Sequence, residues 1–323
     1  LRRALKGTPE FTYGDEAEKL SIETSNPRWL LDRWISQFGF DAAKEIARIN
    51  NTPAPVYVRV TKRFNESPRD VQEAVIAVLQ ESEIRNLEIS LPGDCYQLRK
   101  GNAKLRQFAD LGLIYFQDAA SIMVADLVST GPGRRLLDLC ASPGSKTSRI
   151  FAAQGANNSI IVSGDIYGPR VKVLKSNLTN QLIENPNIVQ FDAEKQLPFR
   201  HEGFDEILVD APCSGTGTIR RNPEIRYFLG ESDFDKLSRK QLNLLRNASK
   251  LIKPGGRIVY STCSLESEEN EHVIEKFLST NDHFRPAEID LDPRFLTQRG
   301  FARTFPQRDN MDGFFVAVLV RKA

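Results

Sequence analysis

The chain has 323 residues, of which 40% are hydrophobic and 27% charged, and its formal net charge is +2. This composition is typical of a soluble globular protein with a sizeable core. The sequence contains no apolar run long enough for a membrane span and no opening signal peptide, so we expect a cytoplasmic protein without a membrane partner.

The four cysteines, Cys95, Cys140, Cys213 and Cys263, are scattered along the chain and form no CxxC pair. The three histidines do not stand near them in a zinc spacing. Neither a disulfide framework nor a bound metal is therefore expected. In a reduced compartment, a cysteine with unusual neighbours is a candidate for chemistry.

The first part of the chain divides into two predicted regions. Residues 1–50 are predicted to be helical, with Pro27 early in an amphipathic helix. Residues 51–116 are predicted to form a small α+β module, because residues 56–60 alternate like a strand and Ser67-Pro68 is typical of a helix start.

Strand-like apolar runs alternate with helical stretches in residues 117–323. This alternation predicts an α/β fold with a mostly parallel, doubly wound sheet covered by helices. The predicted strands span residues 136–140, 160–165, 188–192, 207–210, 257–263 and 314–320.

Four of these strands carry an aspartate at or near the carboxyl end, namely Asp138, Asp165, Asp192 and Asp210. In open α/β sheets a ligand binds beyond this edge. A single aspartate there is more often a helix cap or a turn residue. Four at equivalent positions favour a ligand that carries hydroxyl and amino groups.

The segment after the first of these strands, residues 140–147, has small residues and one glycine before a predicted helix, which permits close approach of a ligand to the backbone. It is neither a GxGxxG motif nor a Walker loop, because Leu139 stands where a Walker loop needs glycine. Asp165 on the next strand suits a ribose diol, which both NAD and S-adenosylmethionine carry. The loop alone does not separate these two cofactors.

Two cysteines follow neighbouring predicted strands. Cys213 stands in Asp210-Ala-Pro-Cys-Ser-Gly-Thr-Gly217, and Cys263 stands between Thr262 and Ser264. A lone cysteine at a strand end is usually a small buried apolar residue. Two of them on one edge of the sheet, one near Asp210, indicate chemistry.

Together, these motifs resemble those of the RNA cytosine-C5 methyltransferase family, which includes the bacterial RsmB (Sun/Fmu) and eukaryotic NSUN enzymes. The resemblance implies a Rossmann-like class I methyltransferase domain that uses S-adenosylmethionine. The RsmB branch is the most similar, and Leu1–Leu5 resembles the last helix of that branch's NusB-like domain, most of which the chain would then lack. Ser145 replaces a glycine that is usual in the family. The matching segments are residues 138–147, 210–217, 219–224, 260–264, 268–271 and 312–315.

The resemblance also implies roles for individual residues. Cys263 is expected to add to carbon 6 of cytosine, Cys213 to assist release, and Asp210, if protonated or hydrogen-bonded, to stabilise charge on the base. The methionine part of the cofactor is expected to lie against Cys140, Ala141, Ser142, Pro143, Gly144, Ser145 and Lys146. Asp165 is expected to bind its ribose, Asp192 its adenine, and Arg170 is either a further contact or a solvated helix residue.

The expected partner is RNA, in the first place 16S rRNA with an unpaired or flipped cytosine. We expect a monomer, in which Arg220, Arg221 and Arg226 hold phosphates. Either Tyr227 or Phe228 is expected to stack on a base, although a core role is favoured for Phe228. Three alternatives remain: a tRNA methyltransferase, a non-catalytic RNA-binding ribosome-assembly factor, and an NAD-dependent oxidoreductase. The missing GxGxxG motif weighs against the last.

Overall fold

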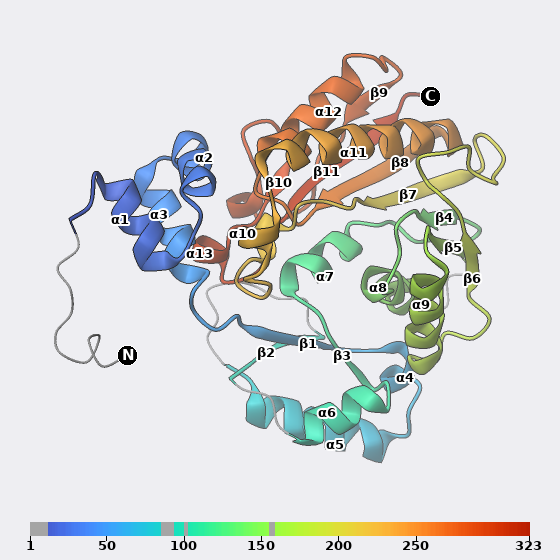
Figure 1. Ribbon diagram of the computed structural model, residues 1–323. Coiled ribbons are helices and arrows are strands. Elements are labelled where there is room, and N and C mark those ends of the chain that lie inside the picture. The colour runs from blue at the N-terminus through green and yellow to red at the C-terminus, as the bar shows by residue number, and fades with distance from the viewer. Residues whose placement is uncertain (1–11, 85–93, 100–102, 155–158) are drawn as a thin grey trace.

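The computed structural model describes residues 12–84, 94–99, 103–154 and 159–323. Figure 1 shows a helical cluster near the N-terminus, a small sheet with its own helices, and a large sheet with helices on both faces. The first eleven residues, which we expected to be helical, lie outside the described residues.

The helical cluster consists of α1 (Glu16–Thr24), α2 (Arg28–Phe38) and α3 (Phe40–Ile49). Asp15 begins α1 by accepting a hydrogen bond from the backbone N–H of Glu18 at 2.7 Å. Trp34 is fully buried and donates from its indole nitrogen to Glu266, far along the chain, at 3.1 Å. The cluster is therefore packed onto the C-terminal part of the molecule.

The small module contains a three-stranded antiparallel sheet in the order β2-β1-β3. The predicted strand at residues 56–60 is confirmed as β1. The helix predicted to start at Ser67-Pro68 is confirmed, since its first turn follows Pro68, and the Ser67 hydroxyl donates to the carbonyl of Arg63. The elements are β1 (Val56–Val60), α4 (Lys62–Asn65), α5 (Arg69–Ser82), β2 (Cys95–Leu98), α6 (Ala103–Asp110) and β3 (Ile114–Phe116).

The remainder of the chain alternates strands and helices, as predicted. Its first half comprises α7 (Ala119–Asp126), β4 (Arg135–Asp138), α8 (Ser145–Gln154), β5 (Ile160–Asp165), α9 (Gly168–Asn180), β6 (Asn187–Gln190) and β7 (Phe204–Asp210). The second half comprises η1 (Thr216–Thr218), α10 (Ile225–Phe228), α11 (Glu231–Leu251), β8 (Ile252–Thr262), η2 (Ser267–Glu269), α12 (Glu271–Leu278), β9 (Phe284–Pro286), η3 (Pro293–Phe295), β10 (Ala302–Arg303), α13 (Pro306–Asp309) and β11 (Phe315–Arg321).

The large sheet has the strand order β10-β11-β8-β7-β4-β5-β6, and β9 pairs with the end of β11. Strands β4 to β8 run parallel, whereas β11 runs antiparallel to β8. The chain proceeds from β4 outward to β5 and β6, then returns to β7 on the other side of β4. Such a reversal opens a crevice at the carboxyl ends of the central strands.

Two apolar cores lie on opposite faces of this sheet. One core packs α11 and α12 on the strands, through residues such as Leu245, Ile274 and Tyr260. The other packs the buried helix α7 between the large sheet and the small module, where Ile122 and Tyr57 belong to one cluster. The carboxyl edge of the parallel strands is left free for a site.

Candidate active site

The two cysteines of the sequence prediction lie side by side at this edge. Strands β7 and β8 are parallel neighbours with Asp210 opposite Ser261, so the loops that follow them start together. The Sγ atoms of Cys213 and Cys263 are 3.2 Å apart, and the backbone N–H of Cys263 points at the sulfur of Cys213 at 3.3 Å. Both side chains are half-buried.

The surroundings of Cys213 change the pKa of its thiol. The hydrogen bond with Cys263, burial and the charges of Cys263 and Glu269 raise the pKa of Cys213 well above its ordinary value. Cys213 therefore holds its proton in this arrangement, with its sulfur against that of Cys263.

An ion pair stands next to the thiols. Lys146 Nζ donates to Asp210 Oδ2 at 2.7 Å, and the hydroxyl of Ser261 donates to the other carboxylate oxygen at 2.8 Å. Burial opposes the charge on Lys146, but the carboxylate of Asp210 more than offsets it and raises the pKa of Lys146. Both carboxylate oxygens of Asp210 thus have hydrogen-bond donors within the protein.

The predicted cofactor loop connects β4 to α8. The backbone N–H of Ala141 bonds the carbonyl of Gly164 on β5 at 2.8 Å, which fixes the start of the loop. Gly144 has φ +101°, and a Cβ there would lie 2.9 Å from Leu174. Ser145, the departure from the family, is the first residue of α8 and is not at positive φ, so its side chain fits without backbone strain.

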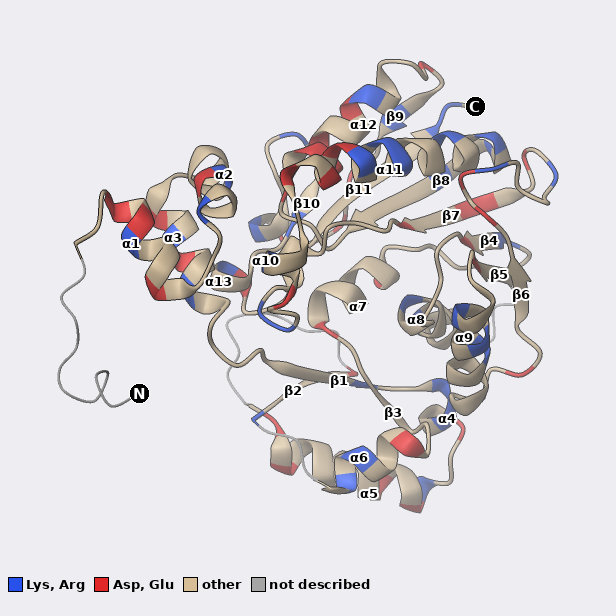
Figure 2. Ribbon diagram, in the orientation of Figure 1, with Lys and Arg blue, Asp and Glu red and all other residues tan. Residues whose placement is uncertain are grey.

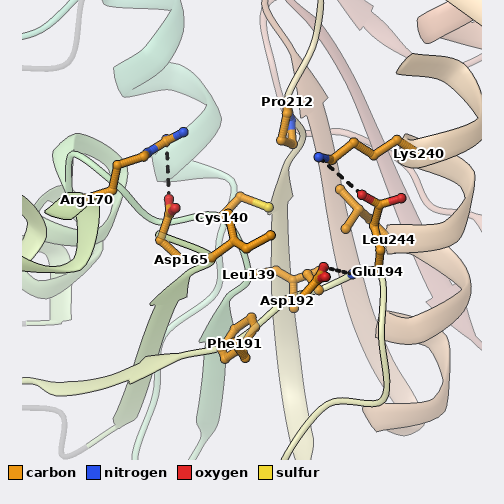
Figure 3. Close-up of a pocket in the computed structure, with 12 residues that line it drawn as sticks. Leu139, Cys140, Asp165, Arg170, Phe191, Asp192, Glu194, Pro212, Lys240 and Leu244 are labelled. Atoms are coloured by element: carbon orange, nitrogen blue, oxygen red, sulfur yellow. Dashed lines mark hydrogen bonds and ion pairs between the residues drawn. The ribbon is translucent and has the colours of Figure 1, made fainter. Parts of the chain in front are cut away.

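A pocket lies beside this loop. Figure 3 shows Asp165 and Asp192 on its rim and apolar side chains between them. The apolar walls are Leu139, Phe191, Pro212 and Leu244, and Cys140 also lines the pocket. Asp165 is paired with Arg170 at 3.3 Å, and Lys240 is paired with Glu194 at 3.2 Å.

These residues fit the adenosine part of S-adenosylmethionine. An apolar slot suits a flat base, and carboxylates at the ends of β5 and β6 suit ribose hydroxyls and an exocyclic amine. The sequence pattern contained Phe191 and Leu139 within the predicted strands but gave no sign that they line a pocket. Lys240 and Leu244, on α11, had no sequence signal at all.

Three arginines expected at the RNA have other partners. Arg226 is buried and donates to the backbone carbonyl of Thr24 and the side chain of Asn51, so it anchors the helical cluster. Arg221 is paired with Asp118 and Asp312. Arg220 donates to Asn310 Oδ1 at 3.0 Å. The expectation for Arg226 is wrong, because its guanidinium is enclosed.

The aromatic residues of α10 are both exposed. Tyr227 is 64% exposed and its hydroxyl donates to the carbonyl of Ser25. Phe228 is 84% exposed, so the prediction that it belongs to the core is wrong. The four-residue helix α10 is too short to bury more than one face.

Comparison with known proteins assigns the family. The 16S rRNA methyltransferase RsmB/F family matches residues 126–320, and the ferredoxin-like domain of RsmF/B-like methyltransferases matches residues 26–100. The chain belongs to the RsmB/F methyltransferase family. This confirms the predicted Rossmann-like fold, the methyltransferase class and S-adenosylmethionine as the cofactor.

This RsmB/F family member matches different shares of the length of its individual relatives. The chain is 33% identical to a probable ribosomal RNA small subunit methyltransferase B of Bacillus subtilis, over 98% of this chain and 71% of the relative. It is 39% identical to ribosomal RNA small subunit methyltransferase F of Citrobacter koseri, over 66% of this chain and only 46% of the relative. The crystal structure of PH0851 is 30% identical, with TM-score 0.84 over 98% of this chain and 70% of that one.

Proposed function

We propose that this protein methylates carbon 5 of a cytosine in small-subunit ribosomal RNA, through a covalent bond between Cys263 and carbon 6 of the base. The observation that carries the proposal is the pair of sulfur atoms 3.2 Å apart at the carboxyl edge of the sheet. A methyltransferase that acts on an oxygen or an exocyclic nitrogen needs no paired thiols.

Addition of a thiolate makes carbon 5 reactive. The Cys263 sulfur forms a bond to carbon 6, and the electron pair of the 5,6 double bond moves into the ring, which makes carbon 5 nucleophilic. S-adenosylmethionine, when bound, supplies a methyl group on a positively charged sulfur. The Lys146–Asp210 ion pair is suited to offset the charge that develops on the base during addition.

Release requires that carbon 5 lose its proton. The electron pair of that C–H bond then re-forms the 5,6 double bond, and the bond between sulfur and carbon 6 breaks, which returns the Cys263 thiolate. We assign acceptance of this proton to the Cys213 thiolate, which forms when Cys213 gives its own thiol proton to solvent after Cys263 has bonded to the base. The main cause of its raised pKa is the hydrogen bond with Cys263, and this cause disappears once Cys263 is bonded to the base.

The proposal includes the way in which RNA reaches the site. The helical segment 1–50 and the module 51–116 are proposed to bind RNA beside the methyltransferase domain 117–323, with the target cytosine unpaired or flipped. Figure 2 shows basic segments on α9 and on α4. On α9, the basic side chains that are partly or fully exposed include Arg170, Lys172 and Lys175.

We further propose a cytoplasmic monomer. Among the described ranges, no helix combines the length and the apolar character that a membrane span needs.

The test is nucleoside analysis after reaction. The protein is incubated with labelled S-adenosylmethionine and either an unmethylated small-subunit rRNA transcript or unmethylated tRNA. The proposal predicts label in 5-methylcytidine from the rRNA. Label in another nucleoside would contradict the cytosine assignment, label from tRNA alone would contradict the substrate, and no label in either would favour an RNA-binding assembly factor.

A further inference from the structure

A buried carboxylate lies between the two cysteine loops. Glu269 ends the short helix η2 after β8, and its residue is 0% exposed. It stands in the Glu268–Glu271 segment, which carried part of the family resemblance without any assigned role. Glu269 is not among the residues that line the pocket, and its side chain instead accepts hydrogen bonds from the two cysteine loops.

Four donors saturate the two oxygen atoms of Glu269. Oε1 accepts from the backbone N–H of Ser214 and from Gln241 Nε2, both at 2.9 Å. Oε2 accepts from the hydroxyls of Ser214 and Ser264, both at 2.5 Å. Each hydroxyl has one hydrogen, so both serine hydrogens point at the carboxylate.

Each of these donors is coupled to a cysteine loop. Ser214 directly follows Cys213, and Ser264 directly follows Cys263. Gln241 on α11 also donates to the carbonyl of Pro212 at 3.0 Å, so the chain is held on both sides of Cys213. One carboxylate thus connects the loop of the first thiol to the loop of the second.

The charge of Glu269 has no cationic partner among the described ion pairs, none of which includes this residue. Burying an unpaired carboxylate is costly, and hydrogen bonds from both loops are its compensation. A carboxylate has only acceptor sites, so it can take four donors at once, which the isosteric amide cannot.

We propose that Glu269 is a positioning residue that sets the separation and direction of the Cys213 and Cys263 thiols. This inference deepens the proposed function and rests on it for its catalytic consequence. Loss of the carboxylate leaves both cysteines in place but removes the side-chain hydrogen bonds that join Ser214 to Ser264 through Glu269. Covalent catalysis by paired groups depends steeply on such geometry.

Proximity of the thiols is measured without RNA. Wild type and Glu269→Gln are treated with diamide, which takes two electrons and the two thiol protons as it oxidises Cys213 and Cys263 to a disulfide, and peptide mapping follows the Cys213–Cys263 pair. Disulfide formation is expected to be at least tenfold slower in the variant. An equal rate would overturn the inference. This result is independent of the RNA chemistry, so it is separable from failure of the proposed function.

Turnover is the second readout. Glu269→Gln is expected to lower kcat for methylation at least tenfold and to change the KM for S-adenosylmethionine less than twofold. The matched control is Glu266→Gln, which is three residues away and equally buried but bonds Trp34 and Arg33 of the helical cluster. Its kcat should remain near the wild-type value; an equal loss in both variants would mean a general structural effect and overturn the inference.

If Glu269→Gln does not fold, Ser214→Ala and Ser264→Ala carry the same test. Each removes one hydroxyl link and leaves Glu269 with the other donors. Each single variant should slow disulfide formation and lower kcat by a smaller factor than Glu269→Gln. In the double variant, the factor should be at most about the product of the two single factors. Wild-type behaviour of the double variant would overturn the inference.

Discussion

Lys146 Nζ lies 2.7 Å from Asp210 Oδ2, so one ion pair joins the cofactor loop to the strand that leads to Cys213. Lys146 is 6% exposed and also lies over the ring of Phe314 at 5.0 Å. In the proposed function, this pair lies between the cofactor and the base. It couples the two halves of the proposed site.

Replacement of Lys146 should therefore act on turnover. We expect Lys146→Met to lower kcat by about two orders of magnitude, because loss of one preorganised charged donor costs roughly that much. Steady-state methylation measures it. Lys253→Met is the control, since Lys253 is paired with Asp205 at 2.7 Å near the amino ends of β7 and β8. Similar losses in both variants would contradict a role for the Lys146–Asp210 pair.

Removal of the Asp165 charge should act on cofactor affinity. Hydrogen bonds to charged groups contribute about 1.5–3 kcal/mol, so Asp165→Asn is expected to weaken S-adenosylmethionine binding roughly 10- to 100-fold. Calorimetric titration measures this. Arg170→Gln should have a smaller effect, because Arg170 is half-exposed and bonds the loop only at its surface. Unchanged affinity of Asp165→Asn would contradict the ribose assignment.

Burial of Asp138 predicts a pH effect on stability. Burial raises its pKa from 3.8 to about 7, although Thr147 donates to it at 2.6 Å. A raised carboxyl pKa stabilises the fold at low pH, and this contribution is lost as pH rises through 7. Between pH 5 and 8 the free energy of unfolding should fall by about 2.6 kcal/mol relative to Asp138→Asn. Denaturant titrations at several pH values measure the difference; parallel profiles would contradict it.

The corrected positions of Arg226 and Phe228 predict opposite outcomes. Arg226→Met should lower the free energy of unfolding by about 2 kcal/mol, because buried carbonyls lose a charged donor.

Phe228→Ala should leave the free energy of unfolding within about 0.5 kcal/mol of the wild-type value, because its ring is in solvent. If Phe228 stacks on RNA, its removal weakens RNA binding instead. Thermal unfolding and filter binding separate the two effects.

Much of the sheet could be predicted from the sequence because its central strands contain apolar runs, and three of them end in aspartate. The parallel order also follows from alternation with helices, and it brings Cys213 and Cys263 to one edge. The antiparallel strands β9 and β10 could not be predicted, because they have three and two residues and no alternation. Long-range partners were also hidden: nothing local in the sequence indicates that Arg226 bonds Thr24 or that Glu269 joins two loops.

The covalent step is tested most directly by trapping it. Wild type, Cys213→Ala, Cys263→Ala and the double variant are incubated with S-adenosylmethionine and small-subunit rRNA, and protein–RNA adducts are measured on a denaturing gel. We predict a persistent adduct in Cys213→Ala, none in the double variant, and no methylation by Cys263→Ala. Methylation by Cys263→Ala at the wild-type rate would contradict the account.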